Sequence, residues 1–218
     1  MRSAFTPIMG WLILLSGCAE PTELPVAQAS PAPASQSSTA ATNSQPLACT
    51  IHGNPVCKLG RAPQIKVSLI NQTKRDIYLV GSLDASDCKW RYPHCYFEVT
   101  GPDGKAVVDD VGRCGFMNAL RLEDFVLVLP GEAFDPYQRI DDYGFFASHQ
   151  LRSSTFQQPG EYRIRFIYST KNANMAPWLG VGSPAEESKA EIASLFQQVP
   201  KIEVRSDEFT LTVVAPDK

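Results

Sequence analysis

The sequence lacks features that several large functional classes require. It has no run of lysine or arginine, and its net charge is −3 over 218 residues. The electrostatic attraction that dominates nucleic-acid binding is therefore missing. No apolar stretch approaches the roughly 20 residues of a membrane-spanning helix, and no internal repeat is evident. The composition, 44% hydrophobic and 20% charged, is that of a globular protein, so we expect neither a nucleic-acid partner nor a multi-pass membrane fold.

Motifs for catalysis and metal binding are also missing. The chain contains no G-x-S-x-G or H-E-x-x-H motif and no phosphate-cradling glycine loop. It has no C-x-x-C pair and no histidine and cysteine cluster at ligand spacing. We therefore expect no catalytic residues, no cofactor and no metal. Several acidic residues do not form a calcium-binding loop and are interpreted as solvated turns: Asp84, Asp87, Asp109-Asp110 and Asp141-Asp142.

The N-terminal segment has the pattern of an export signal. Arg2 supplies a positive start, and residues 8–15 form a short apolar run. As a helix, this run would span only about 12 Å at 1.5 Å per residue, whereas a bilayer core is roughly 30 Å thick. We therefore expect residues 1–17 to be a cleaved signal peptide and not a retained membrane helix.

The four residues at the end of this segment are Leu15, Ser16, Gly17 and Cys18. They resemble the lipobox of bacterial lipoproteins. The resemblance implies that the Cys18 thiol takes a diacylglyceryl group, that signal peptidase II cuts before it, and that the new amino group receives an acyl chain such as palmitate. Two or three chains anchor a protein stably. Because Ala19 and not Asp follows the cysteine, the resemblance further implies an outer-membrane lipoprotein facing the periplasm of a Gram-negative host. An ordinary secretory signal with an incidental cysteine is the alternative.

Residues 18–48 follow as a linker rich in alanine, proline and serine, with Glu20 and Glu23 its only charges. Such a composition cannot bury enough apolar surface to offset the entropy lost on ordering. We expect a disordered tether that spans on the order of 30 Å. Residues 49–218 then form one folded domain.

The domain is dominated by a period of two, which is typical of strands. Turn signals separate the alternating segments, among them Gly101-Pro102-Asp103-Gly104 and Pro130-Gly131. Strands are predicted at 65–69, 77–80, 96–100, 106–108, 125–129, 162–168 and 209–213. Short strands with frequent turns favour a mainly β fold, an antiparallel β-sandwich.

Residues 156–162, Phe-Gln-Gln-Pro-Gly-Glu-Tyr, resemble the tyrosine corner of immunoglobulin-like and fibronectin-like sandwiches. The resemblance implies that Tyr162, at the start of the penultimate strand, hydrogen-bonds back across the corner. It concerns residues 62–215 and the architecture only, because the Cys-Trp-Cys pattern of antibody domains is absent.

One inserted helix is predicted near 184–198. Ser183-Pro184-Ala185-Glu186 has the pattern of a capping box with proline at the first helical position. Apolar residues follow at helical spacing, so the helix should pack one side on the sandwich.

The cysteines other than Cys18 are candidates for disulfides, because an exported chain meets an oxidising compartment. They are odd in number, so one thiol is left over: Cys49, Cys57, Cys88, Cys95 and Cys114. Local pairing would join Cys49 to Cys57 and Cys88 to Cys95. The competing pairing joins Cys95 to Cys114 across the 101–104 hairpin, and spacing does not choose between them.

The densest aromatic and basic segment is residues 90–96, Trp-Arg-Tyr-Pro-His-Cys-Tyr. It contains the candidate binding loop, Trp90, Arg91, Tyr92 and His94. Exposed aromatic residues beside arginine are typical of interfaces. The alternative is that these rings pack over the open end of the sandwich.

These features favour a non-enzymatic binding or accessory module of the cell envelope, held at the membrane by lipid on Cys18 and contacting an envelope protein. An inhibitor or regulator of an exported protease, acting through the 88–95 loop, is the second hypothesis. A hydrolase with a dispersed site around His149 or His94 is the third.

Overall fold

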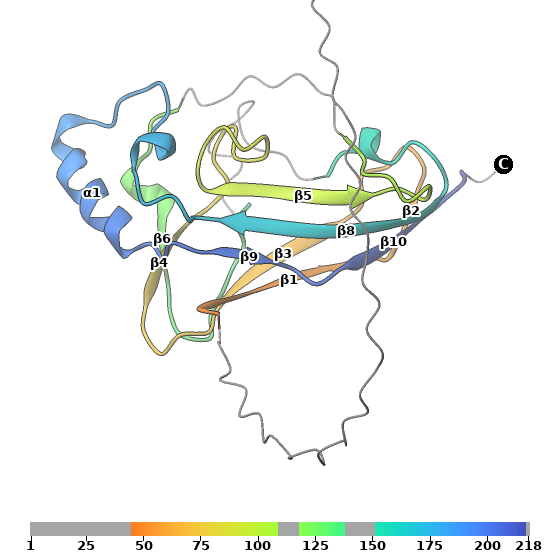
Figure 1. Cartoon of the computed structure of the whole chain (residues 1–218), viewed down its shortest axis with the longest axis horizontal. Helices are drawn as coiled ribbons and strands as arrows, with labels where there is room; N and C mark the ends of the chain where they lie inside the picture. The colour runs from red at the N-terminus through yellow and green to blue at the C-terminus, as the bar shows by residue number, and fades with distance from the viewer. Residues whose placement is uncertain (1–44, 109–117, 138–150, 217–218) are drawn as a thin grey trace, which may run out of the picture. The chain divides into compact units, whose positions relative to one another are not determined.

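A β-sandwich forms the framework of the domain (Figure 1). The computed structural model describes residues 45–108, 118–137 and 151–216, all of which belong to one compact unit. One sheet has the order β1-β3-β7, and the other has the order β2-β10-β8-β5 with β9 also paired to β8. The strands of the first sheet are β1 (Leu47–Gly53), β3 (Ile65–Asn71) and β7 (Ala133–Phe134). Those of the second are β2 (Val56–Lys58), β5 (His94–Thr100), β8 (Gly160–Ser169), β9 (Glu203–Arg205) and β10 (Phe209–Val214).

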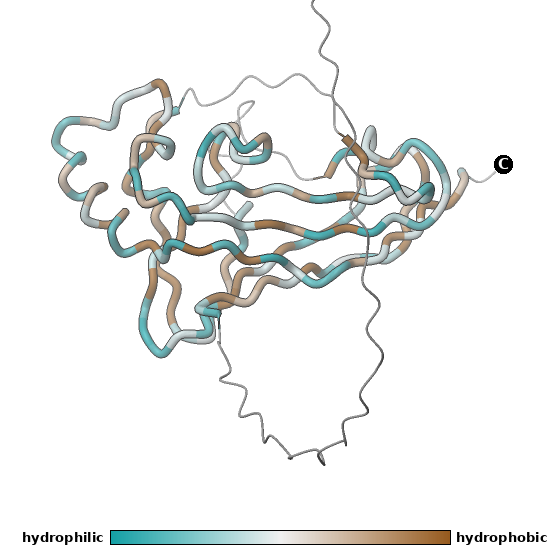
Figure 2. Tube along the Cα trace, in the orientation of Figure 1, coloured by the Kyte–Doolittle hydropathy of each residue, from teal (hydrophilic) through white to brown (hydrophobic). Residues whose placement is uncertain are grey.

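Strand β8 illustrates why these segments form sheets. Tyr162, Ile164 and Phe166 are buried, whereas the alternate residues Glu161 and Arg163 are exposed, and Figure 2 shows the same alternation along the tube. Side chains on successive residues of a strand point to opposite faces, so one face enters the core. The central core cluster contains residues of both sheets, including Leu69 of β3 and Tyr168 of β8, which defines the sandwich.

A buried asparagine, Asn71, marks the end of β3. After Asn71 the chain continues into β4 (Ile77–Val80), which pairs with β6 (Phe125–Val128) as a separate two-stranded ladder. The side-chain NH₂ of Asn71 donates to the backbone carbonyls of Arg75 and Val128, both at 2.9 Å. Its side-chain oxygen accepts from the backbone N–H of Thr73 at 2.9 Å. A buried polar side chain is stable when it is hydrogen-bonded, and here it fixes the direction of β4.

The helix covers the ladder of β4 and β6. Helix α1 (Lys189–Gln198) buries Ile192 and Phe196 in a second core cluster with Trp178, Val80 and Phe125. A 3₁₀ turn at Glu186–Ser188 precedes it. The predicted helix therefore exists, but the Ser183 capping box does not form: Ala185 stands at the cap position with extended backbone, and no side chain caps the turn. The buried anchors lie in the second half of the segment, so packing there determines where the helix runs.

Tyr162 makes the contact that a tyrosine corner requires. Its hydroxyl donates to the Gln158 carbonyl at 3.0 Å and accepts from the Gln158 amide at 3.3 Å. The ring is buried against Phe156, with 5.1 Å between the ring centroids. Between them, Gly160 has a φ of +142°, and a Cβ at this residue would lie 2.6 Å from Pro102 Cγ.

The mainly β fold with one added helix confirms the predicted fold class. Four strands were not predicted: β1, β2, β7 and β9. Strand β1 begins at Leu47, two residues before the predicted start of the domain, and β2 pairs parallel and not antiparallel with β10. The predicted 106–108 strand is reduced to a single bridge between Thr100 and Ala106.

Candidate binding surface

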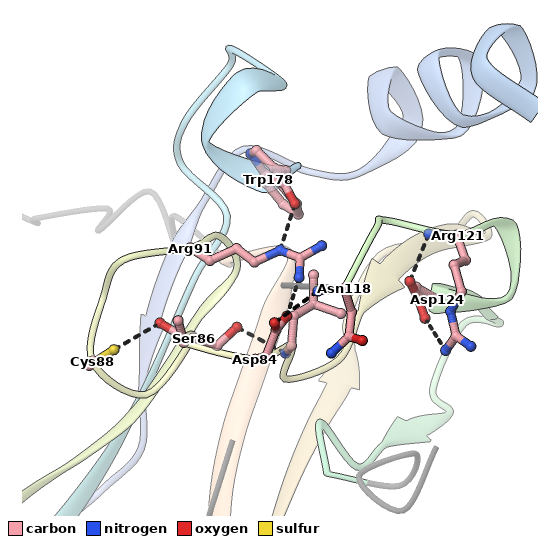
Figure 3. A network of polar contacts seen from close by, with 10 residues as sticks. Asp84, Ser86, Cys88, Arg91, Asn118, Arg121, Asp124 and Trp178 are labelled. Atoms are coloured by element: carbon pink, nitrogen blue, oxygen red, sulfur yellow. Dashed lines mark hydrogen bonds and ion pairs between the residues drawn. The ribbon is translucent and has the colours of Figure 1, made fainter. Parts of the chain in front are cut away.

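The candidate binding loop rests on a buried ion pair. Between β4 and β5, residues 81–93 fold so that the Arg91 guanidinium contacts the Asp84 carboxylate, and both side chains are 0% exposed (Figure 3). Arg91 Nε also donates to the Trp178 carbonyl at 2.8 Å, and the backbone N–H of Asn118 donates to the Asp84 carboxylate at 3.1 Å. A buried charge needs a close partner of opposite sign, and these contacts join three segments of the chain.

Two sequence interpretations are corrected by this pair. Asp84 does not lie in a solvated turn, and Arg91 does not lie on the surface of the loop. The reason is the same for both, since each charge neutralises the other and can therefore be removed from water. The buried side chain of Arg91 holds the loop to the core, whereas the side chain of its neighbour Trp90 is 56% exposed.

Hydrogen bonds hold the loop backbone in one conformation. Ser86 accepts from the Leu83 amide through its hydroxyl at 2.9 Å and from the Cys95 amide through its carbonyl at 3.1 Å. Ala85 and Lys89 have positive φ values, 67° and 64°, which non-glycine residues adopt only when the surroundings require it. The loop is therefore ordered before any partner arrives, which lowers the entropy lost on binding.

A column of rings connects this loop to the core. The Tyr92 ring stacks on His94 with 3.8 Å between centroids, and on the buried Trp178 with 5.8 Å between centroids. Trp178 in turn meets Phe196 of α1 edge-on at 5.2 Å. Both sequence alternatives therefore hold in part: Tyr92 packs against the core, whereas Trp90 projects outward.

Residues of β5 and a lysine just after β8 lie beside the loop, although Ser169 and Ile167 of β8 in the same rows are themselves buried. The strand register places His94 of β5, Ser169 of β8 and Glu203 of β9 in one row. The next row contains Tyr96, with the Lys89 ammonium 4.0 Å above its ring centroid. We name this set the aromatic-basic surface: Lys89, Trp90, Tyr92, His94, Tyr96 and Lys171.

Two lysines and one carboxylate act on the His94 ring. Burial, followed by the charges of Lys89 and Lys171, lowers the pKa of His94, and Glu203 acts against them. Lys171 donates to Glu203 at 2.9 Å, and this bond raises the pKa of Lys171 and lowers that of Glu203. Because Lys171 is paired with Glu203, Lys89 is the cation of this surface that has no carboxylate partner among the described residues, although the chain as a whole has a net charge of −3.

No disulfide joins any two of the four described cysteines. The expected Cys49–Cys57 pair does not form, because β1 runs straight on after Cys49 for about 13 Å, four residues at 3.3 Å each, and Cys57 then joins the other sheet. The expected Cys88–Cys95 pair does not form either, because Cys95 is buried in the central core whereas the Cys88 thiol donates to the Ala85 carbonyl at 3.4 Å. Burial raises the pKa of Cys49 to about 12 and also raises that of Cys95.

Several predicted sites lie outside the described residues. They are the lipobox Leu15, Ser16 and Gly17, the anchor Cys18, most of the linker, Cys114 with its alternative partnership, both acidic pairs and His149. Within the described ranges, no helix has the length and apolarity for a bilayer crossing. No group of three or more histidine, cysteine or acidic residues there is arranged around a metal position.

Sequence reasoning identified Trp90, Tyr92 and His94 as loop candidates and placed Tyr96 in the same aromatic segment. It did not identify Lys89 or Lys171. The cation–π contact of Lys89 with Tyr96 and the effect of Lys171 on His94 depend on the folded chain. Comparison of the chain with family models, curated proteins and solved structures gave no match. Functional assignment therefore depends on this surface.

Proposed function

We propose that the chain is a cell-envelope lipoprotein whose β-sandwich is a non-enzymatic module for binding a protein partner. The observation that carries the proposal is the exposure of Trp90 on a loop fixed by the buried Asp84–Arg91 pair. Exposed tryptophan and tyrosine residues dominate the binding energy of protein interfaces, and a preformed loop binds with a smaller entropic cost.

We infer the cellular location of the module from the N-terminal segment. Cleavage before Cys18 and its acylation would leave the module on a lipid anchor, with residues 19–48 as a spacer. Replacement of Cys18 with serine tests this part. We expect unprocessed precursor and loss of firm membrane association, measured by fractionation and by intact mass. Normal processing and retention at the membrane would contradict the lipoprotein assignment.

Photo-crosslinking in the producing cell tests the binding function. A photoreactive phenylalanine analogue replaces Trp90 in one variant and Val56, an exposed residue of β2, in the control variant. We expect a discrete adduct from position 90 that is absent from position 56. The proposal fails if position 90 gives no adduct, or if the two positions give the same set.

The crosslinked adducts and the purified chain also distinguish between the competing functions. An adduct with an exported protease whose activity rises when residues 89–94 are replaced would favour the inhibitor hypothesis. Turnover of an ester or peptide substrate by the purified chain, lost in His149→Ala or His94→Ala, would overturn the non-enzymatic assignment.

A further inference from the structure

The aromatic-basic surface contains one cation that is not neutralised. Lys171 is paired with Glu203 at 2.9 Å, and the neighbouring Arg205 is paired with Glu98 at 3.4 Å. Lys89 has no carboxylate partner among the described residues and rests instead on the ring of Tyr96. A ring face attracts an ammonium group without cancelling its charge, so Lys89 retains the capacity to bind an anion.

The surroundings of Lys89 add an apolar contact to this charge. Trp90 follows directly and is the aromatic residue with a large exposed fraction among those described. The positive φ of Lys89 and the bond from its amide to the Ser86 carbonyl, at 3.4 Å, fix where both side chains leave the loop. A ligand at this place meets the Lys89 ammonium and, from the next residue along the chain, an exposed indole.

Resting on the proposed function, we infer that the partner presents an acidic peptide segment, in which a carboxylate contacts Lys89 and an apolar side chain packs on Trp90. Charge complementarity supports an acidic partner, because Lys89 keeps its charge over the Tyr96 ring whereas Lys171 is already paired with Glu203. Complementary charges steer association and select partners.

The geometry favours a polypeptide over the other acidic macromolecules. Nucleic acid requires many cations to replace its counterions, whereas Lys171 and Arg205 here are already paired. A glycan stacks on open ring faces, but Tyr92 lies between His94 and Trp178, and Lys89 covers Tyr96. Trp90 remains as a single exposed ring, which suits one apolar side chain.

A titration monitored by nuclear magnetic resonance tests this inference on the full chain labelled with ¹⁵N. The probe is a peptide of alternating glutamate and leucine, and the controls are its glutamine counterpart, a hyaluronan oligomer and a single-stranded oligonucleotide. We expect the acidic peptide to shift amides of residues 85–96 and 203–205, with weaker binding as salt is added. The glutamine peptide should give no such shifts.

Matched variants identify the residue responsible. Lys89→Glu should raise the Kd for the acidic peptide by about tenfold or more, whereas Lys89→Arg should preserve the Kd. Lys66→Glu, at an exposed residue of β3, should leave the Kd unchanged. The spectra themselves report whether each variant is folded. The inference is overturned if Lys89→Glu has no effect, if the acidic and glutamine peptides bind alike, or if hyaluronan or the oligonucleotide binds equally well. In each case an adduct from position 90 would still support the proposed function, so the two failures are distinguishable.

Discussion

Arg91 and Asp84 form an ion pair in which both side chains are fully buried, and this pair supports the residue next to it in sequence, the exposed Trp90. The partners are seven positions apart in sequence, so the pair closes the loop on itself. The bond from Arg91 to the Trp178 carbonyl then joins the loop to a segment 87 residues away. The binding surface is thus attached to the core of the domain.

Replacement of either Arg91 or Asp84 alone should destabilise the folded domain. We expect Arg91→Met or Asp84→Leu alone to reduce the free energy of unfolding by about 3–5 kcal/mol, because the remaining charge stays buried without its partner. The double variant should lose less than the sum of the two single losses. Urea denaturation of the four proteins measures this, and additive losses would show that the two charges do not depend on each other.

Gly160 should tolerate substitution poorly. A Cβ at this residue would lie 2.6 Å from Pro102 Cγ, and the φ of +142° is already unfavourable for other residues. Gly60 is the matched control, with φ +79° and no atom within 4 Å. We expect Gly60→Ala to cost about 1 kcal/mol and Gly160→Ala about 1–3 kcal/mol more, measured by thermal or urea unfolding. Equal losses would contradict the close approach.

The Tyr162 hydroxyl should contribute to stability through its bonds to Gln158. Tyr162→Phe is expected to lower the free energy of unfolding by about 1 kcal/mol. Tyr78→Phe is the control, since the hydroxyl of Tyr78 makes no hydrogen bond with the described residues. A loss in the control as large as in Tyr162→Phe would argue against the corner.

The contribution of Lys201 to the free energy of unfolding should change with pH in the alkaline range. Its ammonium lies 3.7 Å from the Phe196 ring centroid and donates to the last carbonyls of α1, and burial lowers its pKa from 10.5 to about 8. Between pH 8 and 10.5 the unfolded chain therefore binds more protons at Lys201 than the folded chain. The contribution of Lys201 to the free energy of unfolding should then rise with pH across this window.

Comparison with Lys201→Met isolates that contribution. Urea titrations of both proteins at several pH values give the difference in stability, which should move in favour of the unmodified chain as the pH rises above 8. A difference that is constant, or that falls across the window, would show that the lysine pKa is not lowered.

The thiols of Cys49 and Cys95 should react only when the domain opens. Both are buried, and burial raises the pKa of each, which suppresses the reactive thiolate. We expect iodoacetamide to leave both unmodified in the native protein and to modify both in urea without a reductant, as read by peptide mass. Modification that requires prior reduction would mean that a disulfide holds one of them.

Local patterns were sufficient for much of the fold. The alternation in β8 and β10 and the turn at Pro130-Gly131 depend on neighbours in sequence, so they were predictable. The three-residue strands β2 and β9 are too short to show a period and form only because β10 and β8 lie beside them. The expected pairing of Cys49 with Cys57 failed for the same reason, since their spacing does not say that the chain changes sheets between them.

The sequence by itself determined the sandwich class, the tyrosine corner and the aromatic character of the loop, because strand period, turn chemistry and composition are local properties. Only the tertiary structure decided which of the loop residues face solvent. Arg91 is inside because Asp84 and the Trp178 carbonyl are there to receive it, and Lys171 acts on His94 because folding brings together segments far apart in sequence. The burial of a charge depends on its partner, and only the folded chain brings the partners together.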